Sequence, residues 1–254
     1  MRIDDRTKLN EWVAALERRH LADLRVQEVT RALRALSSAY VERRERGTRQ
    51  HVHGALDTAG KRAAFALYYA PMHFIAVTEV VRALGAAQPS PSSIIDLGCG
   101  TGAAGAAWAL SAGSTPTVIG IDRHPWAVSE ARWTLSQLGV HGRVRQGDVG
   151  LLSAPRPKTS VIAAYVLNEL PDDDRRRVED TLVRMAESGG RILILEPLAR
   201  GVAPWWRETA ARITALGGRA DEWRLPLDVP PVVRLFGTAA GLDHRELRLQ
   251  TLFL

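Results

Sequence analysis

Apolar positions recur at helical spacing along the first third of the chain. One set is Leu9, Trp12, Val13 and Leu16. A second set steps by three and four residues: Val26, Val29, Leu33, Leu36 and Tyr40. Residues three and four apart lie on one face of an α-helix. The pattern therefore predicts two amphipathic helices, the second ending by Gly47.

A third apolar stretch begins near Lys61 and is rich in aromatic residues. It carries Phe65, Tyr68, Tyr69, Met72, Phe74, Ile75 and Val77. Pro71 lies inside it, and proline lacks the N–H that a helix interior needs, so we expect a kink or a break there. The polar segment before it, residues 48–60, is expected to be a loop. The aromatic stretch has two possible roles, docking the helices onto the rest of the chain or covering a binding site as a lid.

After residue 89 the pattern changes to an alternation of short apolar runs and helical segments. The apolar runs are residues 93–97, 117–122, 143–146, 160–165 and 191–196, and residues 245–254 alternate as a terminal strand. Such an alternation predicts a mostly parallel sheet with helices on both faces. The Pro/Ser-rich stretch 86–92 is the expected boundary between a helical region, 1–88, and an α/β domain, 89–254.

The first apolar run leads directly into a glycine-rich turn, Asp96-x-Gly98-x-Gly100-x-Gly102. Glycine permits positive φ and lets a ligand approach the backbone without meeting a Cβ. Two ligands compete for this turn. Gly100-x-Gly102-x-x-Gly105 also fits the dinucleotide fingerprint, and Asp122 lies where its ribose-binding acid belongs. The run that opens with Asp96 resembles motif I of class I S-adenosylmethionine-dependent methyltransferases, which implies an adenosyl ligand instead.

Polar residues follow every predicted strand of the sheet. After Asp96 and the glycines come Asp122, Asp148, the segment 165–169 and Glu196. Ligands of open α/β sheets bind outside the carboxyl ends of the strands. Asp122 can accept hydrogen bonds from two ribose hydroxyls, and Asp148 from an adenine amino group.

These residues resemble the class I S-adenosylmethionine (SAM)-dependent methyltransferase superfamily over residues 93–197. The resemblance implies a Rossmann-like, doubly wound α/β fold with a C-terminal antiparallel strand pair and S-adenosyl-L-methionine as cofactor. The cofactor-binding residues that it implies are Asp96, Gly98, Cys99, Gly100, Gly102, Asp122, Arg123, Asp148, Val149 and Tyr165. The dehydrogenase alternative is weaker, because the chain has no Tyr-x-x-x-Lys pair and a dinucleotide fingerprint assigns no role to Asp148.

A narrower resemblance is carried by three segments, 164–170, 195–197 and 68–71. They are similar to the methyltransferase-like proteins associated with the small ribosomal subunit, which implies RNA or a ribosomal component as acceptor. That family usually carries several cysteines for an iron–sulfur cluster, whereas this chain has only Cys99.

Composition narrows the remaining classes of function. The single cysteine excludes an internal disulfide and a multi-cysteine metal site, and no metal is expected. No secretory h-region follows Met1 and no run reaches the length of a membrane span, so we expect a cytoplasmic protein without a membrane partner. His51 and His53 are expected to be solvated loop residues.

The net charge of +6 is concentrated near the N-terminus. The first 89 residues hold 15 Lys and Arg against 10 Asp and Glu. Candidate RNA-contacting residues are Arg31, Arg34, Arg43, Arg44, Arg46 and Arg49. Only three lysines occur in the chain, so an arginine-rich composition without selection for RNA binding is the alternative.

The candidate catalytic residues are Asn168, Glu169 and Glu196. The first two could orient an acceptor, and Glu196 could act as a base; each could instead serve a structural hydrogen bond or cap. Trp205 and Trp206 could stack on a planar acceptor or belong to the core. Three hypotheses remain: a methyltransferase acting on RNA or the ribosome, a small-molecule methyltransferase, and a non-catalytic assembly protein with a SAM fold.

Overall fold

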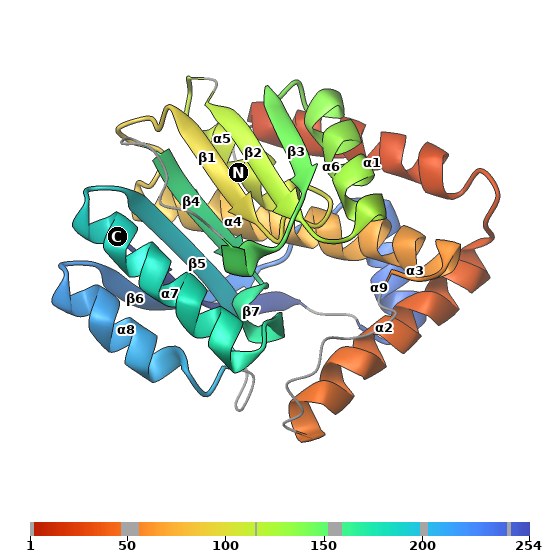
Figure 1. The fold of residues 1–254 in the computed structure, drawn as a ribbon. Coiled ribbons are helices and arrows are strands. Elements are labelled where there is room, and N and C mark those ends of the chain that lie inside the picture. The colour runs from red at the N-terminus through yellow and green to blue at the C-terminus, as the bar shows by residue number, and fades with distance from the viewer. Residues whose placement is uncertain (1–2, 47–55, 115, 152–158, 199–202, 243–244) are drawn as a thin grey trace.

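A computed structural model describes residues 3–46, 56–114, 116–151, 159–198, 203–242 and 245–254. Its centre is a seven-stranded sheet with the order β3-β2-β1-β4-β5-β7-β6 (Figure 1). The strands are β1 Ser93–Leu97, β2 Thr117–Asp122, β3 Gly142–Gln146, β4 Thr159–Ala164, β5 Arg191–Pro197, β6 Arg219–Pro226 and β7 Glu246–Phe253. Strands β1 to β5 pair in parallel, and β7 is antiparallel to both β5 and β6. The expected mostly parallel sheet with a C-terminal antiparallel pair is confirmed.

Helices cover both faces of this sheet. The α-helices are α1 Ile3–His20, α2 Val26–Arg46, α3 Ala59–Ala64, α4 Ala70–Leu84, α5 Ala103–Ser111, α6 Pro125–Gln137, α7 Asp172–Glu187, α8 Trp206–Ala215 and α9 Pro231–Ala240. Single turns are η1 Phe65–Tyr69, η2 Val149–Leu151 and η3 Leu167–Glu169. Helix α9 was not anticipated, although a proline followed by apolar residues at helical spacing marks its start.

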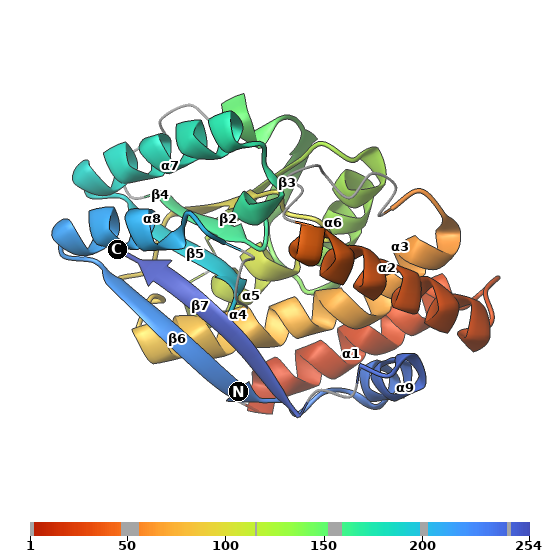
Figure 2. The ribbon, with the colours of Figure 1, turned by 90° about the horizontal axis from the view of Figure 1, so that it is seen from below.

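Alternate strand residues enter two separate cores. On one face, Ile94, Val118 and Ile162 join the N-terminal helices in one cluster with α5, α6 and α9. On the other face, Ile95, Val161 and the apolar side of α7 and α8 form the second cluster. Figure 2, which looks from below, separates α7 and α8 from α4 and α1 across the sheet. This division follows from the two-residue period of a strand.

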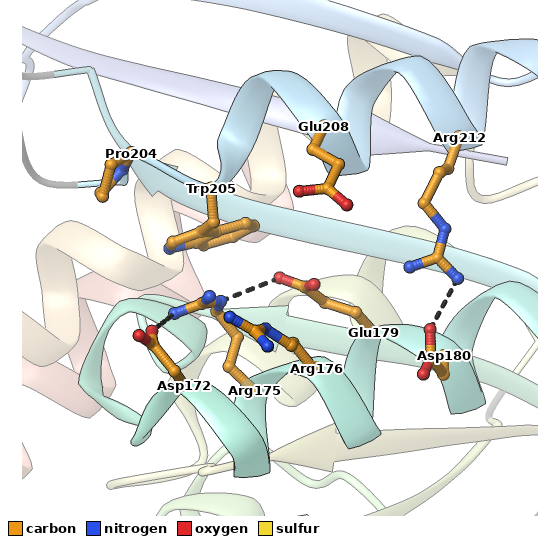
Figure 3. A pocket seen from close by; sticks show the side chains of 9 residues that line it. All are labelled: Asp172, Arg175, Arg176, Glu179, Asp180, Pro204, Trp205, Glu208 and Arg212. Atoms are coloured by element: carbon orange, nitrogen blue, oxygen red, sulfur yellow. Dashed lines mark hydrogen bonds and ion pairs between the residues drawn. The ribbon is translucent and has the colours of Figure 1, made fainter.

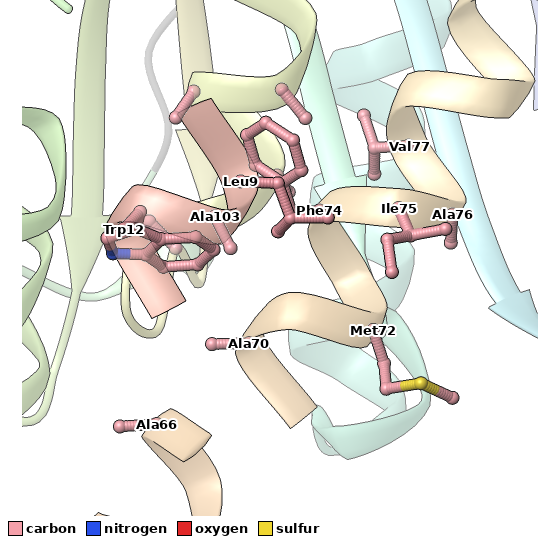
Figure 4. Close-up of a cluster of buried hydrophobic side chains, with 14 of the residues drawn as sticks. Leu9, Trp12, Ala66, Ala70, Met72, Phe74, Ile75, Ala76, Val77 and Ala103 are labelled. Atoms are coloured by element: carbon pink, nitrogen blue, oxygen red, sulfur yellow. The ribbon is translucent and has the colours of Figure 1, made fainter. Parts of the chain in front are cut away.

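The N-terminal helices contribute to the larger core. Trp12 of α1 packs against Phe74 of α4, with ring centroids 5.6 Å apart, and Figure 4 shows both beside Ala103 of α5. The first helix buries all four of its predicted apolar positions. In α2, Val29, Leu33 and Leu36 are buried and Val26 is 39% exposed, and the side chain of Tyr40 lies outside the described residues. The boundary near residue 88 stays a prediction.

Helical structure continues through Pro71. A π-helical turn, Phe65–Tyr69, precedes it, and α4 begins at Ala70. The expected break is therefore wrong, because the wider turn changes the hydrogen-bond register just where proline would leave a carbonyl without its partner, and the alternative, a kink, stays a prediction. Residues 59–84 are long and apolar enough to cross a membrane, yet 78% of the most apolar window is buried in the protein, as in a core helix.

The C-terminal strand is more buried than alternation suggested. Gln250 and Thr251 are both buried, although the pattern placed Gln250 on a polar face. Strand β7 lies between β5 and β6, so both of its edges are paired, and neighbouring residues on its two faces are buried.

Candidate functional site

The turn after β1 requires its glycines. Gly98, Gly100 and Gly102 have φ values of 58°, 52° and 78°, in the left-handed region that other residues rarely adopt. A Cβ on Gly98 would lie 2.3 Å from Cγ2 of Val166, which follows β4. The turn is therefore held against the segment after β4, and β1 and β4 are the neighbouring strands where the order of the sheet reverses.

Asp96 secures the helix that follows this turn. Its Oδ2 accepts a hydrogen bond of 2.8 Å from the backbone N–H of Gly105 in the first turn of α5. The side chain is buried, and this burial raises the pKa of Asp96 to about 7. The chain's own carboxylate thus meets the positive end of α5. A direct contact between Asp96 and a ligand stays a prediction.

Asp122, at the end of β2, lies beside the same turn. Its two oxygens accept hydrogen bonds from the N–H of Gly100, at 2.9 Å, and from the N–H of His124, at 2.8 Å. Asp122 is half-buried, and burial raises its pKa. Each carboxylate oxygen has two lone pairs, so acceptor capacity remains for ligand hydroxyls.

The other residues predicted on this side differ in exposure. Cys99 is buried, and a Cβ on Gly120 would lie 2.9 Å from its Sγ. Burial raises the pKa of the Cys99 thiol, which makes it a packing residue and a poor nucleophile.

Arg123 and Asp148 are exposed, and Val149 is buried. Asp148 accepts a 2.8 Å hydrogen bond from the N–H of Gly150. Their roles toward a ligand stay predictions.

Tyr165, directly after β4, is in an unusual conformation. Its φ of 60° makes it the one non-glycine residue with positive φ among the described residues. Its ring stacks on His73 of α4, with centroids 4.3 Å apart and planes 22° apart. The hydroxyl is buried without a hydrogen-bond partner. Backbone conformations of this kind concentrate at functional sites.

The three candidate catalytic residues lie close to Tyr165. Glu196, at the end of β5, is 0% exposed, and its Oε1 accepts a 3.2 Å hydrogen bond from the backbone N–H of Asn168. Asn168 and Glu169 are half-buried on η3. Burial raises the pKa of Tyr165, and the charge of Glu196 raises it further. The structure brings these residues together at the carboxyl ends of β4 and β5. Their catalytic roles stay predictions.

A row of aromatic side chains from the N-terminal region completes this edge. Between residues 63 and 78 every residue is buried except Phe65, Tyr69 and His73. A Cβ on Gly100 would lie 3.4 Å from the ring of Phe65, so this row reaches the glycine turn. The site prediction did not include these three residues. Their spacing of four residues was the available signal, but it also fits docking of the helix onto the sheet.

The remaining candidates lie elsewhere. Trp205, at 8% exposure, belongs to the core between α7 and α8, and Trp206 packs against it. Arg31 and Arg34 are exposed, and Arg34 donates a hydrogen bond to the carbonyl of Ala239 in α9. The side chains of Arg43, Arg44 and Arg46, and the whole of Arg49, His51 and His53, lie outside the described residues.

A separate hollow of about 330 Å³ lies between α7 and α8 (Figure 3). Most of its charges pair with one another: Arg175 bonds Asp172 and Glu179, and Arg212 bonds Asp180 at 2.7 Å. None of the predicted cofactor or catalytic residues lines it. Geometry and chemistry therefore place the candidate site at the carboxyl ends of the strands and not in this hollow.

Comparisons with known proteins agree on the fold. A methyltransferase-domain family matches residues 94–190. Carboxy-S-adenosyl-L-methionine synthase of Chromohalobacter salexigens is 32% identical over 111 residues, which make up 41% of this chain and 40% of that protein. The chain thus spans well under half of this curated relative.

Solved structures with similar folds include methyltransferases. The mitomycin 7-O-methyltransferase MmcR has a TM-score of 0.50 and 16% identity, over 85% of this chain and 68% of its own. Magnesium protoporphyrin IX methyltransferase from Synechocystis PCC 6803, solved with bound SAM, has a TM-score of 0.49 and 18% identity, over 71% of this chain and 79% of its own. At these identities the likeness concerns the fold alone. Residues 94–190, less than half of the chain, thus match a methyltransferase domain, and the fold around them is the Rossmann-like methyltransferase fold.

Proposed function

We propose that this protein transfers a methyl group from SAM to an acceptor bound at the carboxyl ends of β4 and β5, here called the β4–β5 edge. The observation that carries the proposal is the joint position of Gly98, Gly100 and Asp122 at the point where the strand order reverses. A glycine turn with open backbone and an acid with spare acceptor capacity suit an adenosyl ligand.

The residues present fit this cofactor better than a dinucleotide. The positive φ values of Gly98, Gly100 and Gly102 give the turn a backbone shape that suits the proposed adenosyl ligand. The N-terminus of α5, where a pyrophosphate would bind, already faces the carboxylate of Asp96. Asp122 would hold the ribose hydroxyls, and Asp148 the adenine side. SAM, once bound, supplies a methyl group activated by a positively charged sulfur.

The chain's residues then have to position the acceptor and exclude water. Glu196 is the candidate base because its buried carboxylate can take a proton from an acceptor that must lose one. Asn168 and Glu169 on η3 are the candidate acceptor ligands.

For the acceptor, we propose RNA or a component of the small ribosomal subunit. The support is the narrower resemblance in segments 68–71, 164–170 and 195–197, together with exposed Arg31 on α2. Arg34 supports the RNA proposal less, since it also bonds α9. The curated relative is named for making a derivative of SAM, so its match supports the SAM-binding part and does not indicate an acceptor. A cytoplasmic location is part of the same proposal.

Calorimetry with SAM tests the cofactor. We expect the wild type to bind SAM and Asp122→Ala to bind it at least tenfold more weakly, because a charged acceptor to two hydroxyls is removed. Asp221→Ala on β6 is the control and should bind as the wild type does. Unchanged SAM binding by Asp122→Ala, with the control intact, would contradict the proposed ribose contact.

Transfer of labelled methyl groups from SAM into fractionated cell extract tests the acceptor. Label in ribosomal RNA or ribosomal protein supports the proposal, and RNA binding should weaken steeply with salt. Label confined to small molecules would instead identify a small-molecule methyltransferase. SAM binding without transfer to any fraction would favour the non-catalytic assembly protein.

A further inference from the structure

One face of an otherwise buried helix bears only aromatic side chains. Over residues 63–78 the three residues that remain half-buried are Phe65, Tyr69 and His73, spaced by four. The π-helical turn Phe65–Tyr69 lies in this segment, and turns of this kind frequently occur at functional sites. Docking onto the sheet alone would not explain why these three large rings are the ones left partly open.

These rings form one cluster with Tyr165, here called the aromatic row. The centroid of Phe65 lies 5.8 Å from that of Tyr69 and 6.2 Å from that of His73. His73 stacks on Tyr165 at 4.3 Å. Since Phe65 also borders Gly100, the row extends from the glycine turn to the end of β4, over the point where the strand order reverses.

The row is an uncharged surface with an affinity for cations. Burial lowers the pKa of His73 to about 4, so its imidazole is neutral at pH 7. Burial also raises the pKa of Tyr69 and Tyr165, which keeps both phenols neutral. The faces of aromatic rings carry partial negative charge and attract cations. Glu196, whose charge acts on Tyr165, adds a negative potential at the same edge.

We propose that the aromatic row of Phe65, Tyr69, His73 and Tyr165 binds the sulfonium end of SAM through cation–π attraction. The inference rests on the proposed function. It makes the helix before the methyltransferase domain part of the cofactor site. It also gives the site a preference for the charged donor over the neutral thioether product, S-adenosylhomocysteine, which favours product release.

The test compares calorimetric affinities for SAM and S-adenosylhomocysteine. Phe65→Leu keeps an apolar side chain but removes the ring. We expect it to lose about fivefold more affinity for SAM than for S-adenosylhomocysteine, the size expected of one partly exposed cation–π contact. His73→Phe keeps a neutral ring and should leave the ratio of SAM affinity to S-adenosylhomocysteine affinity unchanged. His73→Lys should lower this ratio more than Phe65→Leu does, because the new positive charge repels the sulfonium.

Phe74→Leu is the matched control, because it makes the same change on the same helix at a fully buried position that packs on Trp12. It should lower stability without changing the ratio of the two affinities. If Phe65→Leu does not fold, Phe65→Met keeps the volume and carries the same expectation. Equal losses for both ligands would overturn the aromatic row as a sulfonium site while leaving the proposed function intact. Failure of the wild type to bind either ligand would overturn both.

Discussion

The carboxyl ends of β1 and β2, here called the β1–β2 edge, and those of β4 and β5, the β4–β5 edge, are built in different ways. At the β1–β2 edge, Asp96 and Asp122 bond main-chain N–H groups of Gly105 and Gly100, so short side chains fix the shape of the backbone. At the β4–β5 edge, rings and a buried carboxylate from α4, β4 and β5 meet through their side chains. A backbone-built site tolerates little change in shape, whereas a side-chain-built site can change its specificity by substitution. Under the proposed function, the backbone-built site holds the adenosyl part of the donor, and the side-chain-built site holds the reacting sulfonium together with the acceptor.

The largest effect is expected from Gly98→Ala at the β1–β2 edge. The new Cβ would meet Val166 at 2.3 Å in a left-handed conformation. Left-handed strain and overpacking together should lower the free energy of unfolding by about 2–5 kcal/mol in urea titrations. Gly139→Ala is the control, because Gly139 has a φ of 64° with nothing within 4 Å, and it should cost only about 1 kcal/mol. Equal losses in the two variants would show that the turn is not packed against the segment after β4.

The second-largest effect is expected from Glu196→Gln at the β4–β5 edge. If Glu196 is the base, methyl transfer should fall about 100-fold, because the amide cannot take a proton. SAM affinity should fall much less than the transfer rate, since the carboxylate acts on the aromatic row only through its charge while it accepts the hydrogen bond from Asn168. The measurement pairs labelled methyl transfer with calorimetry. A matching loss of SAM affinity would mean that the two edges are not separate in function.

The smallest effect is a difference in pH dependence for Asp96→Asn. Burial raises the pKa of Asp96 from its ordinary value to about 7, so the folded state binds the proton more tightly than the unfolded state. The stability of the wild type should therefore fall as the pH rises from about 4 to about 7, and then level off. Asparagine does not titrate and its oxygen can still accept from Gly105.

The stability of Asp96→Asn relative to the wild type should accordingly rise by at least about 1.4 kcal/mol, the equivalent of one pKa unit, between pH 4.5 and pH 8. Urea titrations at the two pH values measure this change. A constant difference between the two proteins would mean that Asp96 has an ordinary pKa.

The difference between the two edges also decides what could be predicted from sequence. Asp96, Gly98 and Asp122 follow their strands directly, and their partners are main-chain groups, so a short motif contains the whole arrangement. The mostly parallel sheet followed from the alternation of strands and helices for the same reason, whereas no local pattern specified the order of the strands. The contact of His73 with Tyr165 joins segments far apart in the chain, and no local pattern specifies it. The continuous helix through Pro71 was missed because a π-helical turn has no simple signal in the sequence.

Strand β7 imposes an order of assembly on the sheet. Strands β1 to β5 can pair as the chain emerges from the ribosome, because each of β2 to β5 finds a partner among segments already made. Strand β6 pairs with β7 alone in the described part of the chain, and β7 inserts between β5 and β6. During synthesis, β6 therefore has no strand to pair with until residues 246–253 are complete. Until then the edge of β5 stays open to other extended chains, so the interval before β7 inserts is when a growing chain is most exposed to misassembly.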